Sequence, residues 1–499
     1  MRLGSVKYGA IFSYLLIFLN TAYGLLVTPY ILSQIGDSQY GVYKTISSLS
    51  ASLAVLDLGF GGTVLRYVAK FAAERKKQEL HEYLGMALTQ TFLVLIGVLL
   101  VGSGVYFALE PMYAASFTVA ELHLAKQLFW ILLANLGLNF FENVFFGIIA
   151  GHNQFAFANG MKILLLLGKI AAVFILLPIY HSALVIVLAQ LVLTFLVMLV
   201  HIAYMHRKLC VRFVFNRWNS GLFWESFRYT LLLFLQSVVI QFNGNVDNIV
   251  IGAVKGSEMV TLYSFALMLF NMYEQLSSSF SGIMLPTVTK RIHDGASAHD
   301  LENLVIQVGR IQFMILGAAL CGFAVVGREF IALWLGAGFE DCYSLALILM
   351  TPVTIPLIQN VCLSILRAKN MMGFRTVALV YSMVVNCILT VFGTKYYGIY
   401  AAAFGTALST VIGSVISMNI YYYKKLHMNV FRMLWETICK ILPGLAAASG
   451  ITILCKALFS SSLHGALLQF LVPAAVFIAV YGVVTFVFCK DELKRLLKK

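Results

Sequence analysis

Apolar stretches of about 20 residues recur from one end of this 499-residue chain to the other. A helix rises about 1.5 Å per residue, so each stretch is long enough to cross a hydrocarbon layer of about 30 Å. Charged residues make up 11% of the chain, well below the roughly 25% of soluble proteins. The sequence therefore predicts an all-α polytopic membrane protein.

The apolar stretches divide the chain into fourteen predicted helices joined mostly by short connections. The expected helices are residues 8–33, 39–69, 83–107, 124–150, 156–178, 183–206, 223–253, 257–286, 301–327, 342–366, 374–394, 397–424, 434–457 and 464–488.

Most of the 35 Lys and Arg residues fall in loops on one predicted side of the membrane or in the C-terminal tail. Because basic loops stay in the cytoplasm, both termini are predicted to be cytoplasmic, which requires an even number of spans. The net charge of +14 is spread over separate segments, which favours an orientation signal over a nucleic-acid surface. The eight cysteines show no metal-binding spacing, so no metal site is expected.

Two segments 220 residues apart align without a gap, residues 36–70 over residues 256–290. Identical pairs include Gly36 and Gly256, and Tyr43 and Tyr263. A shift of six spans preserves orientation, so the halves are expected to be related by a pseudo-twofold axis along the membrane normal. The predicted organisation is an N-lobe (1–220, six spans), a C-lobe (221–427, six spans), and two further helices with a basic cytoplasmic tail (428–499).

Polar side chains inside spans should face the helix bundle or water, because lipid cannot solvate them. The candidates for lining a substrate cavity are Arg66, Lys162, Lys169, Arg228, Arg310, Asn135, Asn139, Asn143, Asn271 and Gln275. Four acids, Asp57, Glu142, Asp247 and Glu274, are expected either to pair with buried cations or to bind a coupling H⁺ or Na⁺. The alternatives are snorkelling for Lys162, Arg228 and Arg310, and hydrogen bonding between helices for the amides.

Lys169 is the residue that snorkelling explains least well. It lies about 20 Å along its helix from the nearest predicted cytoplasmic loop, close to the bilayer centre. Lysines and arginines around a cavity are suited to an anionic substrate such as a phosphate or diphosphate. Neighbouring amides and hydroxyls are suited to sugars.

Three segments resemble a known family. These are IGDSQYGVYKTISSLSASLAVLDLGFGGTVLRYVAKF (35–71), NVDNIVIGAVKGSEMVTLYSFAL (245–267) and YYGIYAAAFGTALSTVIG (396–413). They are similar to the polysaccharide-export flippases of the MOP (multidrug/oligosaccharidyl-lipid/polysaccharide) superfamily, which have a MATE-like fold. Asp57, Arg66 and Asp247 lie on the matching segments. Lys162 and Lys169 have no matching family position and rest on the physical argument alone.

The resemblance implies a non-enzymatic transporter in the bacterial cytoplasmic membrane. It would flip an undecaprenyl-diphosphate-linked oligosaccharide from the cytoplasmic to the outer leaflet, by alternating access through a cationic central cavity. The implied partners are membrane lipids and glycan assembly enzymes, with H⁺ or Na⁺ as the coupling ion and no cofactor. A monomer is the default for a two-lobed transporter.

Three alternatives remain at this point. A peptidoglycan-precursor (lipid II) flippase would share the fold and the cationic cavity. A cation-coupled multidrug antiporter would have a more acidic cavity. A membrane glycosyltransferase or polymerase needs paired catalytic groups, and the predicted outer loops contain no convincing set, so this reading is the least favoured.

Overall fold

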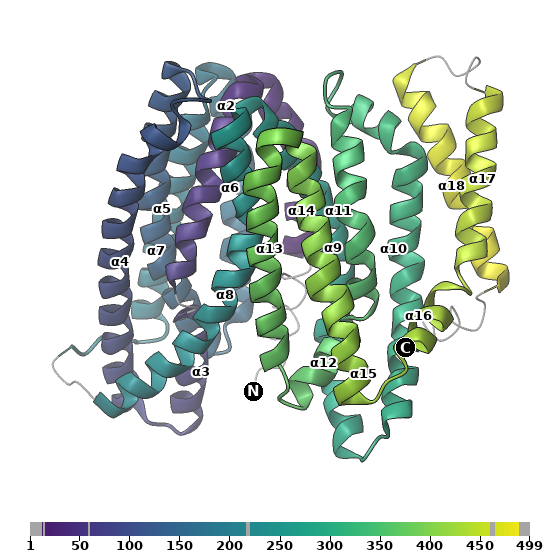
Figure 1. Cartoon of the computed structure of the whole chain (residues 1–499). Coiled ribbons are helices and arrows are strands. Elements are labelled where there is room, and N and C mark those ends of the chain that lie inside the picture. The colour runs from purple at the N-terminus through teal and green to yellow at the C-terminus, as the bar shows by residue number, and fades with distance from the viewer. Residues whose placement is uncertain (1–11, 13–14, 58–59, 216–219, 460–464, 489–499) are drawn as a thin grey trace. The chain divides into compact units, whose positions relative to one another are not determined.

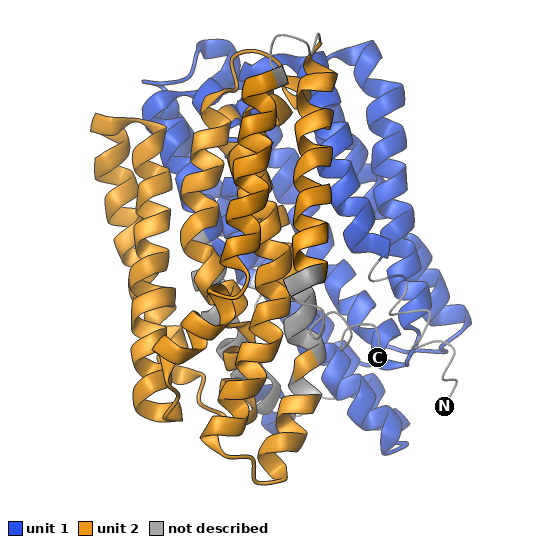
Figure 2. Cartoon of the chain, turned by 90° about the vertical axis from the view of Figure 1, so that its right-hand side faces the viewer, with its two compact units in different colours: residues 1–261 blue, residues 262–499 orange. Residues whose placement is uncertain are grey.

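The computed structural model describes residue 12 and residues 15–57, 60–215, 220–459 and 465–488, and every element in this part is helical (Figure 1). By internal contacts the chain divides into two compact units, residues 1–261 and 262–499 (Figure 2). The boundary between the units lies within one helix, and the expected lobe boundary at residue 220 stays a prediction. The symmetric six-helix lobes remain a prediction.

Unit 1 contains every described helix up to α8 and the first residues of the helix that follows. In order they are η1 (Tyr23–Val27), α2 (Thr28–Leu53), η2 (Ala54–Asp57), α3 (Phe60–Ala73), α4 (Lys77–Tyr113), α5 (Val119–Gly151), α6 (Phe155–Tyr180), α7 (Ala183–Arg207) and α8 (Ser220–Lys255).

Helix α5 is the central helix of unit 1. It begins at a capping box, in which Thr118 accepts from the Glu121 backbone and the Glu121 carboxylate accepts from the Thr118 backbone. In the most apolar 18-residue stretch of α5, 61% of the residues are buried, against 17% in the corresponding stretches of α4 and α6. Helix α5 packs against α2, α3, α4 and α7. The approach of α3 is close because glycines face each other: a Cβ on Gly147 would lie 2.6 Å from the Gly61 carbonyl oxygen.

Unit 2 begins within the helix that follows α8. Its helices are α9 (Ser257–His293), α10 (Ala298–Trp334), α11 (Asp341–Ile358), α12 (Asn360–Ala368), α13 (Gly373–Tyr397), α14 (Ile399–Thr410), η3 (Val411–Ser417), α15 (Met418–Leu426), α16 (Val430–Ile438), α17 (Leu442–Phe459) and α18 (Ala466–Phe488). A second capping box, Ser297 with Asp300, opens α10.

All fourteen predicted stretches contain helix, but the count of fourteen membrane spans is not confirmed. Among the described residues, ten helices are long and apolar enough to cross a membrane, and a bent pair raises the number to eleven. One of the ten, Leu15–Ala73, covers the first two predicted spans together. Helices α8 and α9 are long enough to cross a membrane. In their described residues, however, neither contains a stretch that is apolar enough to count as a candidate span.

Some predicted spans are broken where the sequence reasoning expected one helix. The stretch 434–457 is α16 and α17, bent by 40°, with the break just before Pro443. Pro443 has no backbone N–H to donate to the carbonyl four residues earlier, and its ring crowds that carbonyl, which explains a break at residues 439–441. The stretch 342–366 divides into α11 and α12 at Gln359, three residues after Pro356.

The aligned glycines of the repeat share an unusual backbone conformation. Gly36 has φ 75° and Gly256 has φ 88°, a region that favours glycine over any residue with a side chain. Gly36 interrupts the long N-terminal helix, and Gly256 separates α8 from α9. Both repeat segments also end on a lysine in the last helical turn, Lys70 in α3 and Lys290 in α9. The repeat found in the sequence thus has a local structural counterpart.

Candidate functional site

The two lysines of α6 are held inside unit 1 in different ways. The Lys162 ammonium lies 3.7 Å from the centroid of the Phe146 ring of α5, a close cation–π contact. The charge of Glu142, one turn earlier on α5, also acts on Lys162. Lys162 therefore contacts the neighbouring helix with both an aromatic ring and a carboxylate nearby.

Glu142 itself forms a buried pair with a residue that sequence reasoning missed. Its Oε2 lies 2.9 Å from Nδ1 of His201 on α7, and the His201 side chain is 0% exposed. The other ring nitrogen of His201 has no hydrogen-bond partner among the described residues. The sequence did contain a signal, since His201 is an ionisable residue within the apolar stretch 183–206.

Lys169 lines a small enclosed cavity formed by η1, α2, α6 and α7. The polar groups that share this cavity are Tyr23, Tyr43 and Gln190. Its volume is about 20 Å³, enough for one water molecule. No carboxylate among the described residues lies within ion-pair distance of Lys169. The ammonium is thus half-buried against phenol and amide groups.

A second cation lies beside this cavity. The Lys44 ammonium is 5.3 Å from the Tyr40 ring centroid and 5.9 Å from that of Tyr43, which also lines the cavity. Tyr43 thus contacts Lys44 of α2 with its ring and lines the same cavity as Lys169 of α6. Lys44 was not among the cavity candidates from the sequence.

The three asparagines predicted on one face of α5, Asn135, Asn139 and Asn143, have different surroundings. Asn135 is buried, and Asn139 donates to its carbonyl oxygen at 2.8 Å, a bond within the helix. Asn143 is half-buried, and its backbone faces the close crossing with α3, where a Cβ on Gly61 would lie 2.9 Å from the Asn143 carbonyl oxygen. Part of this polar face is therefore occupied by hydrogen bonding within α5 and by packing against α3.

On α9 the predicted polar residues remain accessible. Asn271 and Gln275 are exposed and Glu274 is half-buried. Tyr273 turns to the other side and shares a hydrogen bond of 2.7 Å with Thr354 of α11. In this unit, the amide face of α9 is therefore separate from its packing face.

The remaining predicted residues lie in separate places. Arg66 is exposed on α3, and Asp247 is buried on α8. Arg310 of α10 donates to the Glu436 carbonyl at 2.8 Å and lies 3.1 Å from its carboxylate, which fastens α16 to α10. The side chains of Asp57 and Arg228 lie outside the described residues.

A model of one family matches this chain over residues 6–292, and its description is "Polysaccharide biosynthesis protein". No curated protein matches the chain.

Solved transporter structures share the fold. "Lipid II flippase MurJ, inward closed conformation" is 15% identical, with a TM-score of 0.73 over 97% of this chain and 99% of that one. An inward-facing multidrug resistance MATE family transporter of the MOP superfamily is 14% identical, with a TM-score of 0.66 over 84% of this chain and 95% of that one. At these identities the likeness shows the fold alone. The expected MATE-like fold is confirmed.

Proposed function

Because the chain belongs to the polysaccharide biosynthesis protein family, we propose that it flips an undecaprenyl-diphosphate-linked oligosaccharide from the cytoplasmic to the outer leaflet of a bacterial membrane. The observation that carries the proposal is Lys169, a cation within a span that faces the interior of unit 1 without a carboxylate partner among the described residues. A charge at this depth costs about 2.5–3.5 kcal/mol even on the mildest scale. An anionic ligand would offset that cost.

In the proposed mechanism the lysines neutralise the lipid diphosphate during its passage. Lys169 and Lys162 lie seven residues apart on α6, a separation of about 10 Å along the helix, which suits stepwise contact with a charged head group. The exposed amide of Asn271 offers hydrogen bonds to sugar hydroxyls. The cavity that contains Lys169 has room for one water only, so the substrate would enter by alternating access, after the helices around it separate.

The buried pair of Glu142 and His201 is our candidate for the site that binds the coupling ion, and the ion we propose is a proton. Glu142 lies one helical turn from Phe146, the residue that contacts Lys162. The charge state of the pair would therefore influence the proposed substrate site. Asp57, Asp247 and Glu274 remain alternative positions. We further propose a monomer with cytoplasmic termini that passes its product to glycan assembly enzymes.

The deciding test is leaflet exposure of an undecaprenyl-diphosphate-linked oligosaccharide in proteoliposomes, under imposed proton or sodium gradients. The variant Lys169→Ala/Arg66→Ala should lose exposure, whereas Lys126→Ala/Lys369→Ala, which removes two other lysines, should keep it. The absence of exposure under both gradients, together with efflux of a cationic dye, would favour multidrug export instead.

Flipping of lipid II is the second candidate. It is favoured by the fold shared with the lipid II flippase over nearly the whole chain. The two substrates share the diphosphate and the isoprenoid chain, so both depend on the same lysines. Competition in one vesicle preparation separates them: if unlabelled lipid II suppresses oligosaccharide flipping and is itself flipped faster, the peptidoglycan precursor is the substrate.

A further inference from the structure

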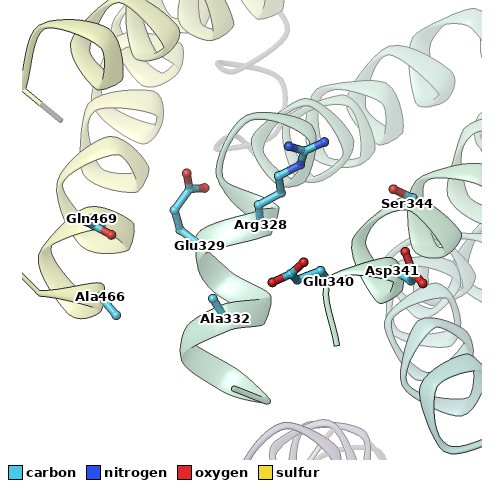
Figure 3. Close-up of a pocket in the computed structure, with 8 residues that line it drawn as sticks. All are labelled: Arg328, Glu329, Ala332, Glu340, Asp341, Ser344, Ala466 and Gln469. Carbon is cyan, nitrogen blue, oxygen red and sulfur yellow. The ribbon is translucent and has the colours of Figure 1, made fainter. Parts of the chain in front are cut away.

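Unit 2 contains a polar pocket at the end where α10 gives way to α11, far along the chain from the α6 lysines. Its volume is about 490 Å³, and it lies between α10, the start of α11 and α18 (Figure 3). The polar residues that line it are Arg328, Glu329, Glu340, Asp341, Ser344 and Gln469.

The charges of the pocket do not cancel. Glu329 is neutralised by Lys456, whose ammonium lies 2.6 Å from its carboxylate. The remaining lining charges are the guanidinium of Arg328, over the Tyr343 ring at 5.2 Å, and the exposed carboxylates of Glu340 and Asp341. One positive and two negative groups thus face the same space.

An apolar groove of about 500 Å³ lies between α13 and α14. It is lined by Leu389, Gly393, Tyr397, Ala401, Phe404 and Leu408, among others. From Tyr400 to Leu408 it extends about 12 Å along α14, close to half of a hydrocarbon layer of about 30 Å.

One hydrogen bond joins the pocket and the groove. Tyr400 lines the groove, and its hydroxyl donates to Oδ1 of Asp341, in the pocket wall, at 2.8 Å. A charged compartment at helix ends and an apolar compartment along the membrane-spanning part of two helices therefore share a wall. A ligand that fits both must have a polar head and a hydrocarbon chain.

We propose that this composite site binds a zwitterionic phospholipid whose head group carries a primary amine. The phosphate pairs with Arg328, the ammonium lies between Glu340 and Asp341, and one acyl chain fills the groove beside Phe404. An anionic head group matches less well, because it offers no cation to the two carboxylates and is repelled by them. By the same reasoning a lipid diphosphate is a poor ligand, so the site is distinct from the proposed transport substrate.

The test is retention of lipid by the full-length protein, and it needs no transport assay. Protein purified in detergent is incubated with phosphatidylethanolamine or phosphatidylglycerol of identical acyl chains, and bound lipid is counted by native mass spectrometry. The wild type should retain the amine lipid about two- to fivefold better, as expected for partly exposed charge pairs.

Matched variants separate the two compartments. Glu340→Gln/Asp341→Asn should abolish the preference, because the asparagine can still accept from Tyr400 but carries no charge. Asp294→Asn, in the α9–α10 loop, should leave the preference unchanged. Leu408→Trp should lower retention of both lipids, whereas Val384→Trp, on the exposed face of α13 outside the groove, should not.

Equal retention of both lipids by the wild type, a preference for phosphatidylglycerol, or no bound lipid would each overturn the proposal. A Leu408→Trp variant that forms dimers less readily than wild type, with lipid retention unchanged, would assign the groove to a second copy of the chain. Gel filtration and the thermal midpoint of each variant identify any that fail to fold. Because binding is measured directly, a failed flippase assay and a failed lipid site are distinguishable.

Discussion

Four basic residues within the helices, two in unit 1 and two in unit 2, have different surroundings. In unit 2, Arg310 bonds to Glu436, and Lys456 to Glu329. In unit 1, Lys162 contacts a ring and Lys169 a water-sized cavity. A cation with a carboxylate partner is already compensated and holds helices together. A cation without a carboxylate partner is available to an anionic ligand. Burial alone therefore does not identify a functional charge.

The largest expected effect comes from removing the charge of Lys169. Lys169→Met keeps the length of the side chain and should reduce flipping about ten- to a hundredfold, since charge-assisted bonds contribute about 1.5–3 kcal/mol. The thermal midpoint should stay equal or rise, because a poorly compensated charge is lost. Lys169→Arg, which keeps the charge, should retain more activity. Full activity in Lys169→Met would break the comparison between the units.

Arg310 should behave in the opposite way. Arg310→Met removes the bonds to Glu436 and should lower stability by about 1–2 kcal/mol, with faster hydrogen exchange in α16. Flipping per folded molecule should be unchanged. The double variant Arg310→Met/Glu436→Gln should not recover stability, because Glu436 also pairs with Arg432 at 2.8 Å and its neutralisation removes that bond as well. Lost transport at normal stability would instead place Arg310 in the substrate path.

The two repeat glycines offer a comparison of the halves at single positions. Gly36→Ala and Gly256→Ala should each lower stability by about 1–3 kcal/mol, because a residue with a side chain is strained at these positive φ values. Gly256→Ala should cost more, since a Cβ there would lie 3.1 Å from the Ser116 carbonyl oxygen, whereas Gly36 has open space. Thermal unfolding in detergent measures both. Gly62→Ala, at negative φ in open space, is the control.

The smallest effect is expected at an exposed ion pair. Lys126 lies 2.7 Å from Glu110, but both groups are solvent-accessible. Because water and salt screen such pairs, Lys126→Ala should change neither the thermal midpoint nor flipping measurably. A clear loss of transport in this variant would show that exposed, paired charges also govern the activity, and would argue against a special role for the α6 lysines.

The sequence predicted helices more reliably than it predicted partners. Apolar runs and their polar interruptions located helix in every expected stretch, and the repeat alignment paired two glycines that both have positive φ in the structure. The breaks at residues 359 and 439–441 were missed. At residues 439–441 the reason is that a proline inside an apolar run permits either a kink or a continuous helix. Among the described residues the candidate spans number ten to eleven, because one long helix covers the first two predicted spans and because α8 and α9 are less apolar.

The candidate site was predicted only in part, for a physical reason. Helical periodicity shows which residues share a face of their own helix, so the stripe of α5 and the lysines of α6 could be identified. It does not show which helix lies opposite. Glu142 pairs with His201, 59 positions later, and Arg310 with Glu436, 126 positions later.

By itself, therefore, the sequence determined the class of the protein, because apolar length and backbone hydrogen bonding in lipid leave a single solution. It also determined that several charges must be compensated within the spans. Only the tertiary structure decided how each one is compensated, because that depends on the side chains packed against it from helices distant in the chain. The same physics gave Arg310 a carboxylate and left Lys169 beside a cavity of one water.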